Sequence, residues 1–186
     1  DYADGLVILS SNSNTTNLTG NITTTGDNAE GLYLNDSNSN TTTINGNIIT
    51  SGTRARGLFL RFSDSNTTNL PGNITTTGDN AEGLILLFSD SNTITINGDI
   101  ITSGTDGDSE PILLDNSDSN TITLSGKVQS LGGDQAISID VDSDANTFII
   151  ESGSTFLGDF ENLGTNTVIT NQGVMDGIAN TGSIAT

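Results

Sequence analysis

The sequence predicts an all-β fold: a right-handed, single-stranded parallel β-helix with three strands per coil, about 26 residues per coil and roughly seven coils. Two observations predict it. First, the segments 1–26, 27–52, 53–78 and 79–104 align without a gap, and a fixed period of this length is typical of solenoids. Second, each segment holds short runs of alternating apolar and polar residues between turns that contain Gly or Asn, which indicates strands and not helices.

Apolar residues recur in three columns, one for each strand of the coil. Leu32 and Leu34 represent the first strand, Ile44 the second and Ile48 the third, and similar residues return at the same places in neighbouring coils. At the inter-strand spacing of about 4.8 Å, each column stacks aliphatic side chains into a narrow core. Inward hydroxyl groups are expected at one corner, from Thr24, Thr50, Thr76 and Thr102.

An Asn recurs at the turn before the second strand. Asn tolerates the left-handed backbone conformation, and stacked amides can bond to one another along the axis, so we assign these residues a structural role. They are Asn14, Asn40, Asn66, Asn92, Asn120, Asn146 and Asn166. Their spacing divides the single domain, 1–186, into four regular coils at 1–104, irregular coils at 105–161 and shortened, stalk-like coils at 162–186.

Composition disfavours several classes of function. The chain has 23 Asp and Glu against four Lys and Arg, and this net charge of −19 opposes binding to nucleic acid, which depends on clustered cations. It has no His, the commonest general base and metal ligand, and no Cys for disulfides or thiolate sites. No stretch has the length of a transmembrane span. We expect no catalytic residue and no cofactor, with calcium as the one ion to consider.

One cation has a predicted structural place. In register, Arg56 lies between Glu30 of the coil before and Glu82 of the coil after. Opposite charges on neighbouring strands attract each other. The pattern therefore predicts a ladder of ion pairs on the surface that fixes the register of the coils.

Aromatic and apolar residues are expected on the outside of the first wall. Tyr33, Phe59 and Ile85 stack there in register, with Phe62 and Phe88 nearby. Such a ridge can hold a partner or a second rod that packs alongside, because exposed apolar patches often mark interaction sites. The alternative is that these are ordinary strand aromatics without a binding role.

Outward Thr residues form arrays on the second wall. Two Thr on one strand lie about 7 Å apart and successive coils about 4.8 Å apart, which are the dimensions of ice-binding solenoids. The array consists of Thr41, Thr43, Thr93, Thr95, Thr121 and Thr123. Asn17 and Asn69 interrupt it, and Thr is also a good strand residue for any solvated face.

An acidic turn near the sixth coil resembles a calcium-binding loop. Asp140, Asp142, Asp144 and Glu151 fall in the spacing of its ligands, which predicts a calcium site. Ala145 stands where that loop needs Gly, so the alternative is a solvated acidic turn.

Two segments carry a family resemblance. The run GNITTTGDNAEGLYLNDSNSNTTTINGNIITSG at 20–52 resembles passenger-domain repeats of bacterial autotransporters. The run NLGTNTVITNQGVMDGIANTGSIAT at 162–186 resembles the stalk coils that precede the translocating barrel in that family. The resemblance implies export and display at the bacterial cell surface, anchored by an outer-membrane barrel not present in this chain. We therefore expect this chain to be a piece of a longer protein.

The leading hypothesis is a non-catalytic, surface-displayed passenger fragment that serves as an adhesin or as a structural spacer. Its partners would be surface molecules of host or neighbouring cells, or further copies of itself, including copies stacked end to end on unpaired strands. Ice binding by the Thr arrays is the first alternative. A carbohydrate-active β-helix enzyme or tailspike-like protein is the second, although near-identical coils argue against the unique constellation that catalysis needs.

Overall fold

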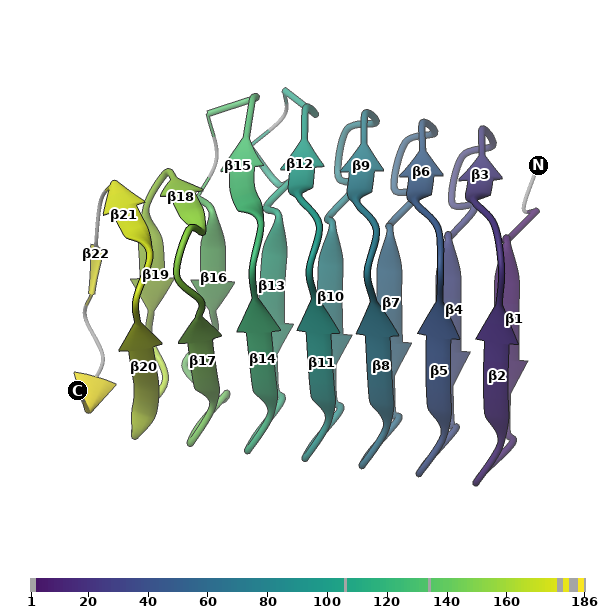
Figure 1. The fold of residues 1–186 in the computed structure, drawn as a ribbon, viewed down its shortest axis with the longest axis horizontal. Coiled ribbons are helices and arrows are strands. Elements are labelled where there is room, and N and C mark those ends of the chain that lie inside the picture. The colour runs from purple at the N-terminus through teal and green to yellow at the C-terminus, as the bar shows by residue number, and fades with distance from the viewer. Residues whose placement is uncertain (1–2, 106, 134, 177–178, 181–183, 186) are drawn as a thin grey trace.

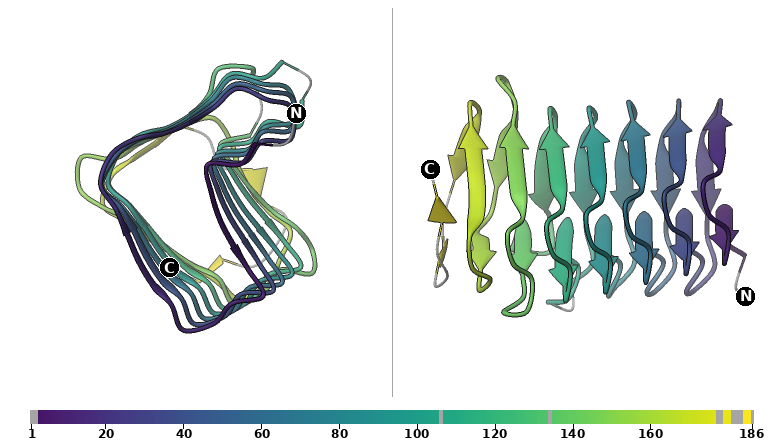
Figure 2. Two further views of the ribbon diagram at one scale, coloured as in Figure 1. Left: turned by 90° about the vertical axis from the view of Figure 1, so that its right-hand side faces the viewer. Right: turned by 90° about the horizontal axis from the view of Figure 1, so that it is seen from below.

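The computed structural model describes residues 3–105, 107–133, 135–176, 179–180 and 184–185, and in these ranges every regular element is a β-strand. The strands form three parallel sheets, called here wall 1, wall 2 and wall 3, and the chain visits them in that order in each coil (Figure 1). Seen from the N-terminal end, the chain runs clockwise as it recedes, so the solenoid is right-handed (Figure 2). The predicted fold class is confirmed.

The bounds of the strands follow the repeat. Wall 1 contains β1 (Leu6–Leu9), β4 (Leu32–Asn35), β7 (Leu58–Arg61), β10 (Leu84–Leu87), β13 (Ile112–Asp115), β16 (Ile137–Ile139), β19 (Phe160–Asn162) and β22 (Ala179–Asn180). Wall 2 contains β2 (Thr15–Leu18), β5 (Thr41–Ile44), β8 (Thr67–Leu70), β11 (Thr93–Ile96), β14 (Thr121–Leu124), β17 (Thr147–Ile150), β20 (Thr167–Asn171) and β23 (Ile184–Ala185). Wall 3 contains β3 (Ile22–Thr24), β6 (Ile48–Thr50), β9 (Ile74–Thr76), β12 (Ile100–Thr102), β15 (Lys127–Ser130), β18 (Thr155–Leu157) and β21 (Val174–Asp176).

The strands stay in register where the repeat is interrupted. Leu84 of β10 pairs with Leu58 in the coil before, 26 residues away, and with Ile112 in the coil after, 28 residues away. The two extra residues lie in the connection from β12 to β13, which projects from the walls. The turn absorbs the insertion, because shifting a strand would misplace every inward side chain.

The core is a continuous ladder of buried side chains. Leu32, Ile44 and Ile48, one from each wall, have no exposed surface. In the later coils larger rings fill the interior, where Phe148 and Phe160 meet edge to face with centroids 5.3 Å apart. Burial of this apolar column is the main source of stability, and each coil depends on its neighbours to cover it.

The connection from wall 3 to wall 1 projects from the prism and folds back before wall 1 begins (Figure 2, left). We call this connection the lobe; in the regular coils it covers residues 25–31, 51–57 and 77–83. Thr50 and Thr76 point inward at its start, as predicted, and their hydroxyl groups donate to the carbonyl oxygens of Ala55 and Ala81 at 2.5 and 2.6 Å. The lobe ends at a residue such as Gly57, where a Cβ would lie 2.5 Å from the carbonyl oxygen of the next coil.

The connection from wall 1 to wall 2 is tighter, and we call it the Asn corner (residues 10–14, 36–40, 62–66, 88–92, 116–120 and 140–146). The side-chain oxygen of Asn66 accepts hydrogen bonds from the backbone N–H and the side-chain amide of Asn40, at 2.8 and 3.1 Å. The backbone bond recurs from Asn14 through Asn120, so the predicted ladder is confirmed. Its members are Asn14, Asn40, Asn66, Asn92, Asn120 and Asn146.

The ladder does not extend to Asn166, where the prediction was wrong. Thr147 pairs with Val168, so the buried Thr167 takes the ladder position and Asn166 lies beside Ala145. Asn166 has φ of 57° at the exposed bend. The spacing of Asn residues missed this because the shortened coil shifts the ladder position by one residue.

Candidate functional site

The outward face of wall 2 carries the predicted Thr residues in two columns. Thr41, Thr93 and Thr121 belong to the first column, and Thr43, Thr95 and Thr123 belong to the second. Asn17 and Asn69 interrupt only the second column. The sequence-based prediction treated the two columns as one interrupted array. The first column is unbroken over six strands. Its members are Thr15, Thr41, Thr67, Thr93, Thr121 and Thr147.

The predicted contacts of Arg56 lie in the lobe. Its guanidinium Nη1 lies 3.2 Å from Oε1 of Glu30, and its Nε lies 2.8 Å from Oε2 of Glu82. The backbone N–H of Arg56 also donates to Glu30 at 2.6 Å. The predicted ladder forms, but Glu30 and Glu82 are each only 6% exposed, whereas the side chain of Arg56 is 22% exposed, so the carboxylates are buried and only the cation reaches the surface. The fold of the lobe covers the carboxylates, which the strand pattern does not reveal.

Burial changes the acidity of both glutamates. Burial raises the pKa of Glu30 from 4.5 to about 7, against the opposing charge and hydrogen bonds of Arg56. Burial likewise raises the pKa of Glu82, again opposed by Arg56. One cation thus serves two carboxylates whose ionised forms are poorly solvated. Such a triad holds coils together, but the low exposure of both carboxylates leaves no room for a substrate.

The aromatic stack of wall 1 is covered at Phe59, whereas Tyr33 stays partly exposed. The rings of Tyr33 and Phe59 stack with centroids 5.0 Å apart, and the guanidinium of Arg56 lies 4.9 Å from the centroid of Phe59. Phe59 is 7% exposed and Ile85 is 4% exposed, although both point away from the core. The predicted exposure of these two residues was wrong, because the lobe and its arginine lie against the start of wall 1 (Figure 2).

A second aromatic stack is exposed at the Asn corner. Phe62 and Phe88 stack with centroids 5.1 Å apart and with 41% and 44% of their surfaces exposed. We call these two residues the aromatic pair. The guanidinium of Arg61 lies 4.8 Å from the centroid of Phe62. Both Phe residues have positive φ, 47° and 50°, a conformation that is rare for bulky side chains.

The predicted calcium ligands do not form a metal site. Asp140, Asp142 and Asp144 lie in the turn from β16 to β17, whereas Glu151 follows β17 at the other end of wall 2. Among the residues that the structure describes, no group of three or more acidic side chains could hold a metal ion. Asp144 instead accepts hydrogen bonds from the backbone and hydroxyl of Thr165, at 2.6 and 2.9 Å.

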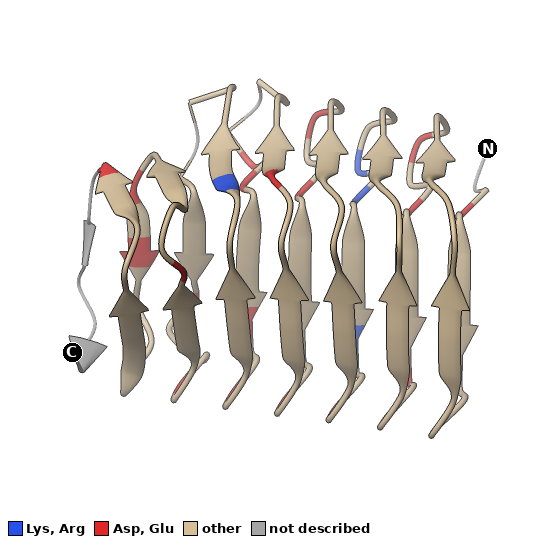
Figure 3. Ribbon diagram, in the orientation of Figure 1, with Lys and Arg blue, Asp and Glu red and all other residues tan. Residues whose placement is uncertain are grey.

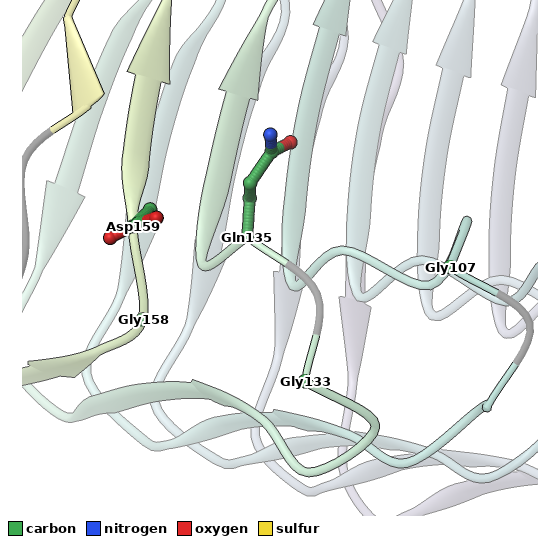
Figure 4. A pocket seen from close by; sticks show the side chains of 5 residues that line it. All are labelled: Gly107, Gly133, Gln135, Gly158 and Asp159. Carbon is green, nitrogen blue, oxygen red and sulfur yellow. The ribbon is translucent and has the colours of Figure 1, made fainter.

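An open depression of about 470 Å³ lies at the turns of the irregular coils (Figure 4). Its described lining consists of Gly107, Gly133, Gln135, Gly158 and Asp159. Gln135 donates to Glu161 at 2.7 Å, and three of the five lining residues offer only backbone groups. This lining can form hydrogen bonds but presents no pair of groups suited to acid–base chemistry.

A further ladder, which the sequence did not predict, runs along the Asn corner. The backbone N–H of Asp90 donates to Oδ1 of Asp64 at 2.8 Å, and the N–H of Asp118 donates to Oδ1 of Asp90 at 2.7 Å. The same bond joins Asn12 to Asn38 and continues to Asp144. The alternation of Asn and Asp at one position concealed it. Figure 3 shows acidic residues on several of the turns between strands.

No protein-family model, curated protein or solved structure shows a significant match to this chain. In the described part of the chain no helix is long and apolar enough to cross a membrane.

Proposed function

We propose that this chain is a non-catalytic, rod-shaped segment of a bacterial surface protein of the autotransporter type, which acts by contact along its length as an adhesin or as a spacer. The observation that supports it most is the repetition of the outward faces. On wall 2, the first five coils present only Thr or Asn at the two outward positions, one inter-strand spacing apart. A surface of this kind offers many weak contacts, which suits adhesion by avidity.

The stiffness of the rod supports a spacer role. From the first coil to the sixth, each coil is joined to the next by three sheets and by the Asn ladder, and the coils superimpose when viewed along the axis (Figure 2). Length then grows with the number of coils, at about 4.8 Å each. Adding coils extends reach without a new fold.

Two experiments test the proposal. An antibody raised against the chain should label intact cells of the source organism, and labelling that requires permeabilised cells would contradict surface display. Beads coated with the purified chain should attach to cells or to one another if the segment is an adhesin. If the antibody labels intact cells but the beads attach neither to cells nor to one another, the segment is a spacer and not an adhesin.

Ice binding is the second candidate, and the unbroken Thr column of wall 2 favours it. Six Thr residues in register on a flat sheet form a regular array of hydroxyl and methyl groups. Thermal hysteresis of the purified chain should then be measurable, and Thr67→Lys together with Thr93→Lys at the centre of the column should abolish it. Equal hysteresis in this variant, or none in the parent chain, excludes the ice-binding role.

A further inference from the structure

The carboxylates of the Asn corner are not needed for its hydrogen bonds. In the first coils the position is held by Asn12 and Asn38, whose Oδ1 atoms accept the same backbone bonds, at 2.6 Å each, as the aspartates accept later. An amide therefore serves the ladder as well as a carboxylate does. Nevertheless the next four coils carry aspartate at this position. These residues are Asp64, Asp90, Asp118 and Asp144.

This row of charge opposes folding. Like charges on directly opposite strands repel, and here they recur at each inter-strand spacing. In each aspartate the ladder uses only Oδ1, so Oδ2 stays available to a partner and the negative charge of the carboxylate is not required by the ladder. A charge that weakens the fold and adds nothing to the hydrogen bonding indicates a role outside the fold.

The aromatic pair departs from its own repeat in the same coils. The position of Phe62 and Phe88 is held by Asp36 in the coil before and by Asn116 in the coil after, and both adopt the same left-handed conformation. Asn and Asp tolerate this conformation, whereas Phe does not favour it. The two residues also keep 41% and 44% of their surface exposed, so part of the apolar surface that would repay this conformation stays in solvent. Phe62 and Asp64 belong to the same turn, where they flank the buried Ser63, and both reach the surface.

The chemistry of this patch indicates the charge of its partner. A row of carboxylates beside exposed rings is complementary to a segment with both cationic and apolar side chains. The stack already accepts one guanidinium, that of Arg61, 4.8 Å from the ring centroid of Phe62. A second copy of this chain would bring the same acidic row against itself, at a net charge of −19 per chain. Calcium lacks a group of three acidic ligands among the described residues.

We propose that the Asn corner of the third to sixth coils is a docking site for a basic, apolar segment of another polypeptide. Its Lys or Arg side chains meet the row of Asp64, Asp90 and Asp118, and its apolar side chains pack on Phe62 and Phe88. The segment runs along the axis of the rod. This inference deepens the adhesive half of the proposed function and rests on it.

The test uses the purified chain and short labelled peptides in which Lys alternates with Leu, Lys with Ser, or Glu with Leu, monitored by fluorescence anisotropy. The Lys–Leu peptide should bind most tightly, and salt should weaken its binding. Phe62→Asn with Phe88→Asn, and Asp64→Asn with Asp90→Asn and Asp118→Asn, should each weaken it at least roughly tenfold. Asn occurs naturally at these positions in other coils, as Asn116, Asn12 and Asn38, so both variants are expected to fold.

The matched control removes three carboxylates elsewhere: Asp27→Asn, Asp79→Asn and Asp99→Asn. Each of these also accepts one backbone bond through Oδ1. The control should keep most of the peptide affinity. If it weakens peptide binding as much as the corner variant does, the lower net charge of the chain explains the loss and the docking site is excluded. The corner variant should also melt at a higher temperature than the parent chain; a lower melting temperature overturns the premise that these charges oppose folding.

Other outcomes assign the corner to other occupants and overturn the proposal. Dimers in sedimentation that the Phe variant dissociates would indicate a second copy, and calcium binding that the Asp variant abolishes would indicate a metal. If coated beads attach but the peptides do not bind, the docking site is contradicted and the adhesive role still stands. If the peptides bind but the antibody does not label intact cells, the docking site is supported and display at the cell surface is contradicted.

Discussion

The Asn corner and the lobe solve the same problem, a sharp change of direction in every coil, by different physical means. At the Asn corner, neutral side chains such as Asn66 and Ser63 accept the backbone N–H of the coil before, and the arrangement repeats from coil to coil. At the lobe the repeat is broken once, where Arg56 joins Glu30 and Glu82. A neutral ladder distributes stability evenly along the rod, whereas the ionic triad concentrates it in three successive coils.

The largest difference between the two regions should appear when the cation of the lobe is removed. Arg56→Met leaves Glu30 and Glu82 buried without a counter-charge, which we expect to lower the free energy of unfolding by about 3 kcal/mol at neutral pH. Urea denaturation measures this change. Arg54→Met removes an exposed cation two residues away and should change stability by less than about 0.5 kcal/mol. Equal effects of the two variants would show that the triad adds no stability.

The Asn corner should respond to the loss of one amide. Asn92→Ala removes the oxygen that accepts the backbone N–H of Asn66 at 2.8 Å and leaves this buried donor unpaired. We expect a loss of about 2 kcal/mol in the free energy of unfolding. Asn45→Ala, which removes an exposed amide bonded to Asn17, is the control and should have little effect. If both variants unfold at the same urea concentration, the ladder is not a source of stability.

Stability at the lobe should depend on pH, whereas that of the neutral ladder should not. The pKa of Glu30 is about 7 in the fold and 4.5 otherwise, so between these values the folded chain holds a proton that the unfolded chain releases. The contribution of Glu30 to stability therefore falls as pH rises through this window. We expect the parent chain to lose about 1–2 kcal/mol more than Glu30→Gln between about pH 5 and pH 8. Parallel pH profiles of the two proteins would contradict this shift.

The smallest effect sharpens the comparison with a matched pair of inward hydroxyl groups. Thr68, which follows the Asn corner, is 1% exposed and its hydroxyl has no hydrogen-bond partner. Thr68→Val should therefore stabilise the chain by up to about 1 kcal/mol. Thr76 at the lobe donates to Ala81 at 2.6 Å, so Thr76→Val should destabilise it by about 1 kcal/mol. The signs of the two changes in melting temperature decide whether the hydroxyl of Thr68 is tolerated or needed.

Much of the fold could be predicted because the repeat states the same information several times. Leu32, Ile44 and Ile48 were placed inward from alternation alone, and the Asn ladder followed from spacing through Asn146. Prediction failed at Asn166, where the period changes. A shift of one residue places Thr167 in the ladder position and leaves Asn166 at the bend before it. The calcium interpretation of Asp140 and Glu151 failed because linear spacing ignores the strand that separates them.

The sequence by itself determined the walls, the register and the inward columns, because a period of two along each strand and of 26 between coils leaves one arrangement that stacks the recurring aliphatic residues in the interior. Only the tertiary structure decided which of the outward residues are exposed to solvent. Phe62 and Phe59 both point away from the core, yet Phe62 is exposed and Phe59 is covered. Phe59 is covered because Arg56 of the lobe lies over its ring. Burial of an outward residue depends on what folds over it, and that neighbour belongs to another turn of the chain.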